Sequence, residues 1–96
     1  MTDAEMLAAV KTALFGSASS AYPDDLLQIY IADVQAFMID AGVPVNVVTS
    51  QAAVGCIARG VNDTWNYSSG NVEYSPVFYK RLIQLSSGGG ANVQTT

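Results

Sequence analysis

Two aspartates seven residues apart are the clearest candidates for acid–base chemistry in this chain of 96 residues. Asp33 and Asp40 share one face of a predicted helix, and paired carboxylates exchange protons when one of them lies in a dry pocket. Here, however, they separate two apolar stripes of the same helix, which is where a solvated or ion-paired edge belongs. We therefore interpret both as edge residues, and we predict that they pair with Arg59, Lys80 or Arg81 of a neighbouring subunit.

No other residues form a reactive set. The chain has no histidine, which removes the commonest general base and metal ligand. Cys56 stands alone in an apolar helical stretch without a base to activate it, so we interpret it as a buried, inert thiol. Gly55 and Gly60 have the separation of a phosphate-binding loop, but no Gly-Lys-Ser/Thr follows them. The sequence therefore predicts no catalytic residue, no cofactor and no metal site.

Composition favours self-association. Half of the residues are apolar and 12% are charged, whereas about 25% is usual for a soluble domain. The net charge is −4, with only four basic residues, so a single chain cannot bind a nucleic-acid backbone tightly. A single cysteine and the lack of a leader or a long apolar run lead us to expect folding inside the cell and no membrane span.

The chain is predicted to form one small all-α domain of four helices over residues 1–85, followed by a flexible Ser/Gly-rich tail over residues 86–96. A Thr2–Glu5 capping box and Gly16 bound the first helix. The second, long and central, is expected to start near Pro23 and to stop at Gly42. Ser75 caps the last helix, with Pro76 as its first residue. The four predicted helices span roughly 3–15, 23–41, 50–66 and 76–85.

The connections are less regular. Val43–Val48 is expected to be a short apolar connector that can adopt an extended conformation. The third helix then starts at Thr49 or Ser50. Residues 67–74 are expected to form a polar loop or a short hairpin. On the last helix, we expect four side chains to face inward, namely Val77, Phe78, Leu82 and Leu85.

The second helix is apolar on two sides. Its wide main face is expected to form the core, and its narrower second face then needs a partner, because contiguous exposed apolar surface usually marks an interface. The main face comprises Leu26, Leu27, Tyr30, Ile31, Val34, Phe37, Met38 and Ala41. The second face comprises Ile29, Ala32, Ala36 and Ile39.

Two further patterns leave alternatives open. Gly55 and Gly60 either permit a close approach between helices or merely weaken the third helix. Five aromatic residues near the end of that helix are interpreted as packing between the third and fourth helices, with interface anchors as the alternative. These aromatic residues are Trp65, Tyr67, Tyr74, Phe78 and Tyr79.

The order of these segments resembles that of the small head–tail connector proteins of tailed bacteriophages, also called head-completion or DNA-packaging adaptor proteins. The likeness covers residues 4–85 and lies in three stretches: the opening helix MLAAVKTAL (6–14), the acidic start of the long helix DDLLQIYIADVQAFM (24–38), and the aromatic helix end VNDTWNY (61–67).

This resemblance implies a non-enzymatic virion protein that assembles in the cytoplasm of a host bacterium. About a dozen copies would form a closed ring below the portal through which packaged DNA passes without tight binding. The portal protein and the tail-side connector proteins would be its partners. The alternative is a small helical adaptor that binds a partner helix in a groove. An enzyme subunit whose site is completed by another chain is the third.

On this reading two sets of site residues are predicted. The subunit interface would comprise Ile29, Ala32, Asp33, Ala36, Ile39, Asp40 and Arg59. Docking to the portal or the tail would use Ser69, Gly70 and Asn71 in the polar loop, together with the tail.

Overall fold

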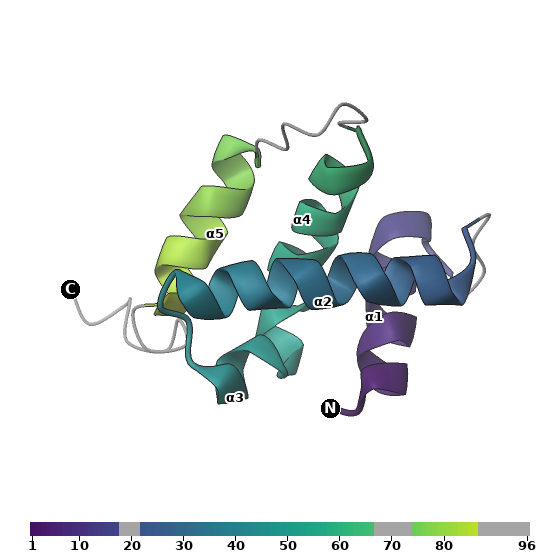
Figure 1. The fold of residues 1–96 in the computed structure, drawn as a ribbon, viewed down its shortest axis with the longest axis horizontal. Helices are drawn as coiled ribbons and strands as arrows, with labels where there is room; N and C mark the ends of the chain where they lie inside the picture. The colour runs from purple at the N-terminus through teal and green to yellow at the C-terminus, as the bar shows by residue number, and fades with distance from the viewer. Residues whose placement is uncertain (18–21, 67–73, 87–96) are drawn as a thin grey trace.

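The computed structural model describes residues 1–17, 22–66 and 74–86, and within these ranges the chain is all-α without a strand, as predicted (Figure 1). The described ranges contain five α-helices and one short 3₁₀ helix, where four helices were expected. They are α1 (Asp3–Phe15), α2 (Asp24–Asp40), α3 (Val45–Val48), η1 (Gln51–Ala53), α4 (Val54–Asn66) and α5 (Pro76–Ser86).

Both ends of α1 follow the sequence signals. The Thr2 hydroxyl accepts a hydrogen bond from the Glu5 amide at 3.1 Å, and the Glu5 carboxylate accepts one from the Thr2 amide at 2.7 Å. This reciprocal pair satisfies two amides that a helix start otherwise leaves open. At the other end, Gly16 takes a left-handed conformation with φ of 76°, and its amide donates to the Thr12 carbonyl.

The central helix is α4 rather than α2. Although α2 is the longest helix, α4 contacts α1, α2 and α5, and in Figure 1 it lies behind α2 between α1 and α5. The reason lies in the composition of α4, whose small residues allow neighbours to approach from several directions. Ile57 and Val61 of α4 are fully buried together with Leu27, Met38 and Phe78 from the surrounding helices.

Gly60 lies where α4 packs closely against α2 and α5. A Cβ atom at this position would lie 2.7 Å from Val34 Cγ1 and 2.8 Å from Phe78 Cε1, which no ordinary packing allows. A Cβ atom on Gly55 would meet nothing closer than an Arg81 nitrogen at 3.9 Å. Each of the two alternatives therefore applies to one glycine: Gly60 permits close contact between helices, whereas Gly55 only lowers helix propensity.

The expected apolar connector is instead helical. Val43 and Val48 are both buried, and an extended chain would place them on opposite faces because they are an odd number of residues apart. The turn α3, which begins after Pro44, brings Val48 back to the core. Ser50 then precedes η1, so α4 starts at Val54 rather than at Thr49 or Ser50, and α2 starts at Asp24, after Pro23.

Two inward-facing sets were predicted too widely. Only Leu27, Ile31, Val34 and Met38 of the α2 main face are buried, whereas Phe37 is 36% exposed and Ala41 is also exposed. On α5, Phe78, Leu82 and Leu85 are buried as expected, but Val77 is 56% exposed. In both cases the neighbouring helices cover a narrower arc than the apolar stripe spans.

The aromatic residues form two groups instead of one. Trp65 stacks on Tyr22 and Phe15, with ring centroids 4.5 and 5.8 Å away, at the ends of α1 and α4. In the second group, Tyr74, Phe78 and Tyr79 lie against Phe37 of α2 (Phe37–Tyr74 4.9 Å). The second group therefore joins α5 to α2 as well as to α4, while Tyr67 lies outside the described residues.

Candidate subunit interface

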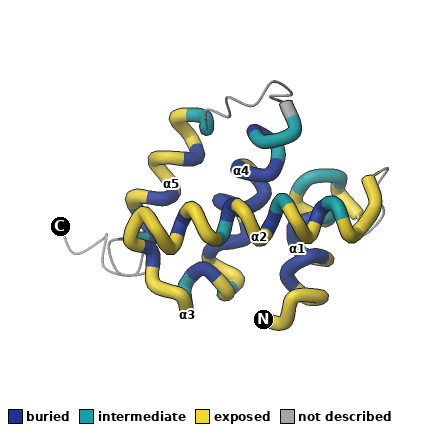
Figure 2. The backbone as a smooth tube through the Cα atoms, in the orientation of Figure 1, coloured by how far each residue is buried: buried dark blue, intermediate teal, exposed yellow. Residues whose placement is uncertain are grey.

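The two sides of α2 differ in burial. Its inner side packs on the core, while Ile29 is 64% exposed and Ile39 is 42% exposed on the outer side, where Ala32 and Ala36 are exposed as well. Exposed positions recur along most of the length of α2 in Figure 2. Together with Asp33 and Asp40, which are also exposed, these residues form one surface, the α2 face: Ile29, Ala32, Asp33, Ala36, Ile39 and Asp40.

The charge of the α2 face is purely acidic. Helix α2 carries four aspartates and no lysine or arginine. One of them, Asp24, is used inside the chain, since its carboxylate lies 2.9 Å from Lys11 Nζ and joins α2 to α1. Burial raises the pKa of the Tyr74 phenol, and the nearby negative charge of Asp33 raises this pKa further. A hydrogen bond between Tyr74 and Thr64 lowers it.

An open hollow of about 500 Å³ lies beside the α2 face, between α2 and the end of α4. It is lined by Ile29, Tyr30, Ala32, Asp33, Ala36 and Thr64. Tyr30 and Thr64 were not among the predicted interface residues. Tyr30 is half-buried and was expected in the core, and Thr64 belongs to a different helix, so only the packing of α4 against α2 brings it here.

Arg59 does not belong to this surface. It lies on α4, where its guanidinium is 3.9 Å from Asp63 Oδ1, and it lines a separate hollow with Ala13 and Leu14 of α1. The other six predicted interface residues share the outer side of α2, whereas Arg59 faces a different neighbour within the same chain. Any pairing of Arg59 with the α2 face therefore has to come from a second molecule.

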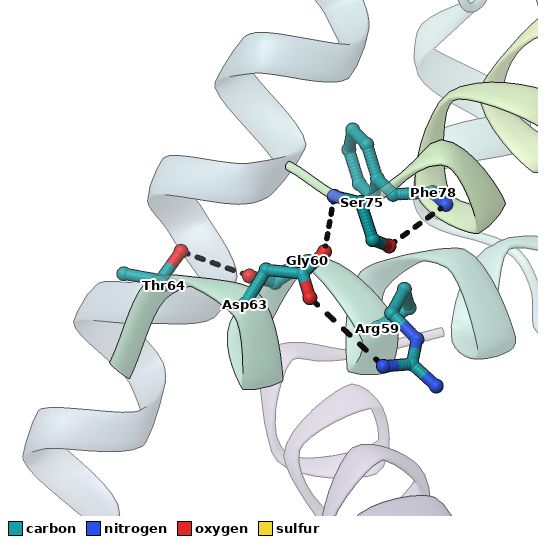
Figure 3. A network of polar contacts seen from close by, with 6 residues as sticks. All are labelled: Arg59, Gly60, Asp63, Thr64, Ser75 and Phe78. Carbon is teal, nitrogen blue, oxygen red and sulfur yellow. Dashed lines mark hydrogen bonds and ion pairs between the residues drawn. The ribbon is translucent and has the colours of Figure 1, made fainter. Parts of the chain in front are cut away.

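The start of α5 is held by a polar network that the residue pattern did not predict (Figure 3). Asp63 is only 7% exposed, and its Oδ2 accepts a hydrogen bond from the Ser75 amide at 2.9 Å. The Ser75 hydroxyl in turn accepts from the Phe78 amide at 3.3 Å, which confirms Ser75 as the cap of α5. A carboxylate at a helix start is electrostatically favourable, so this network fixes α5 on α4.

The candidate reactive groups lack the surroundings that chemistry needs. Cys56 is buried and its thiol donates to the Phe78 carbonyl at 3.9 Å; burial raises its pKa to about 11, so the thiol stays protonated and unreactive at neutral pH. The exposed carboxylates of Asp33 and Asp40 are in no dry pocket. In the described ranges, no group of three His, Cys, Asp or Glu side chains is placed to hold a metal ion.

The predicted docking residues Ser69, Gly70 and Asn71 lie outside the described residues, as do residues 87–96 of the predicted tail. Ser86, the first residue assigned to that tail, instead ends α5. None of the helices in the described part is both long and apolar enough to cross a membrane.

Comparisons with protein-family models, with curated proteins and with solved structures find no match to this chain.

Proposed function

We propose that this chain is a structural subunit of a homo-oligomeric ring, of the head–tail connector type found in tailed bacteriophages. The observation that carries the proposal is the α2 face, because its apolar residues are exposed in the described part of the chain. Covering an isoleucine side chain contributes on the order of 1–2 kcal/mol. In a ring every subunit makes such a contact on each of its two sides.

The charge of the chain supports the connector role in particular. A net charge of −4 with four basic residues suits a channel through which DNA slides, since like charge opposes sticking to the phosphate backbone. In this proposal the ring lies below the portal, and the portal and tail-side proteins are its partners. The subunit binds no cofactor and catalyses no reaction.

The α2 face is tested by the double substitution Ile29→Asp with Ile39→Asp. We expect the wild-type protein to form oligomers of ten or more copies, and the variant to be a folded monomer, because two carboxylates in an apolar contact are strongly unfavourable. Light scattering coupled to size exclusion gives the mass, circular dichroism checks the fold, and negative-stain imaging shows whether the oligomer is a ring.

The matched control adds the same charge elsewhere. Val45→Asp with Asn46→Asp changes two exposed residues of α3, so it should assemble like the wild type. Oligomers of unchanged mass in the Ile29→Asp/Ile39→Asp variant would show that the α2 face is not the contact.

The hollow between α2 and α4 favours one second candidate, an adaptor that binds a single partner helix there. The same experiment separates the two functions. A protein that stays a monomer or a dimer at high concentration supports the adaptor, whereas a ring supports the connector.

A further inference from the structure

The chain carries a second exposed surface whose charge is opposite to that of the α2 face. Val77 is 56% exposed and Ile83 is 61% exposed on α5; Lys80 lies between them on the helix surface, and the exposed Arg81 lies beside Val77. We call these four residues the α5 face. Helix α5 contains no acidic residue, and α2 contains no basic one.

We propose that the α5 face of one subunit binds the α2 face of a second copy of this chain, which makes the contact head-to-tail. This inference rests on the proposed self-association and names the surface that completes it. A contact between two identical α2 faces would bring aspartate against aspartate, and a contact between two α5 faces would bring cations together. Of these three pairings, only that of an α2 face with an α5 face joins opposite charges. A contact between two different surfaces is also the kind that builds rings.

The apolar and charged residues have a similar spacing along the two faces. Along α2, Ile29, Asp33 and Ala36 lie at about 0, 6 and 10.5 Å, given a rise of 1.5 Å per residue. Along α5, Val77, Lys80 and Ile83 lie at about 0, 4.5 and 9 Å on the same scale. Each helix therefore presents an apolar residue, a charge and another apolar residue in nearly the same register.

Among the described residues, the basic side chains of α5 form no ion pair with an acidic side chain of their own subunit. Of the four basic residues, Lys11 and Arg59 already form ion pairs inside the chain, whereas Arg81 donates to the neutral amide of Gln84 at 3.3 Å. In the described part of the chain, Lys80 and Arg81 take part in no intramolecular salt bridge. In the proposed contact, these two cations pair with Asp33 and Asp40 of a second copy.

The first test exchanges the charges. Either Asp33→Lys with Asp40→Lys, or Lys80→Asp with Arg81→Asp, should reduce assembly at least tenfold in the concentration required, because both contacts then join like charges. All four substitutions in one chain should restore assembly to within a few-fold of the wild type. Light scattering over a concentration series measures this, and circular dichroism confirms the helix content of every variant.

The second test separates the two surfaces. Val77→Asp with Ile83→Asp removes the α5 face, and Ile29→Asp with Ile39→Asp removes the α2 face, so each variant alone should be a monomer. Mixed together, one retains the face that the other lacks, and cross-linking should capture a 1:1 pair that does not grow further.

The outcomes distinguish the two proposals. Wild-type rings with unchanged assembly of the α5 variants would overturn the head-to-tail pairing and leave the ring standing. A wild-type protein that is monomeric up to about 1 mM would overturn both, since a contact weaker than about −4 kcal/mol sustains no ring. Loss of assembly in the α5 variants without restoration by the fourfold exchange would overturn the pairing of these charges.

Discussion

Gly60 and Gly55 occupy the same helix, but they respond oppositely to a methyl group. At Gly60 the added Cβ overlaps Val34 and Phe78, so Gly60→Ala should destabilise the fold by about 1–3 kcal/mol. At Gly55 the added Cβ makes only an ordinary contact with an Arg81 nitrogen at 3.9 Å, so Gly55→Ala should stabilise the fold by up to about 1 kcal/mol through helix propensity. Urea unfolding of both variants measures the difference. Equal stability of the two variants would show that α2 and α5 do not pack closely against Gly60.

Cys56 gives the fold a sensitivity to alkaline pH. Burial raises its pKa from 9.0 to about 11, so the folded state holds the thiol proton that the unfolded state releases. The stability from this group is therefore complete below pH 9 and is lost between pH 9 and about pH 11, by up to about 2–3 kcal/mol. The Cys56→Ala variant should lose less over the same range, which separates the thiol from the tyrosines and lysines. A parallel decline of wild type and variant would exclude Cys56 as the cause.

At the scale of single elements, the sequence predicted helix ends best where hydrogen bonds within one turn determine them. The Thr2–Glu5 box and the Ser75–Pro76 start are confirmed because caps depend only on residues within one turn. The turn α3 was missed because valines favour extended chain locally, while the burial of Val48 is decided by the rest of the molecule.

Partners between elements were harder to predict than the elements. Trp65 was expected to join its neighbours in sequence, but it stacks on Tyr22 and Phe15. Asp63 was not recognised, because its role depends on where α5 begins relative to α4. Periodicity shows which side of a helix is apolar, but not how many neighbours cover that side.

At the scale of the whole molecule, the exposed position of the α2 face followed from residue types alone. Once Leu27, Ile31 and Val34 face the core, Ile29 and Ala36 must point outward on the same helix. Arg59 was placed in the same set only by charge, and the structure puts it beside α1 and Asp63. The α5 face was not predicted, because Val77 had been assigned to the core.

Self-association also predicts how heat stability depends on protein concentration. When only the folded chain assembles, a tenfold rise in concentration stabilises each chain by about 1.4(n − 1)/n kcal/mol for n copies. This is about 0.7 kcal/mol for a dimer and about 1.3 kcal/mol for a ring of twelve. For a domain of this size, the Tm should rise by roughly 3–5 °C in the first case and 5–10 °C in the second.

The Ile29→Asp/Ile39→Asp variant is the natural reference, because a monomer has a Tm that does not change with concentration. Calorimetry of the wild type and of this variant over a hundredfold range therefore reports the number of copies without imaging, provided that unfolding is reversible. A slope near the ring value supports the connector, and a slope near the dimer value supports the adaptor. A flat wild-type Tm over that range would mean that the α2 face remains exposed in solution, which would exclude the ring and leave the adaptor, whose partner is a different chain.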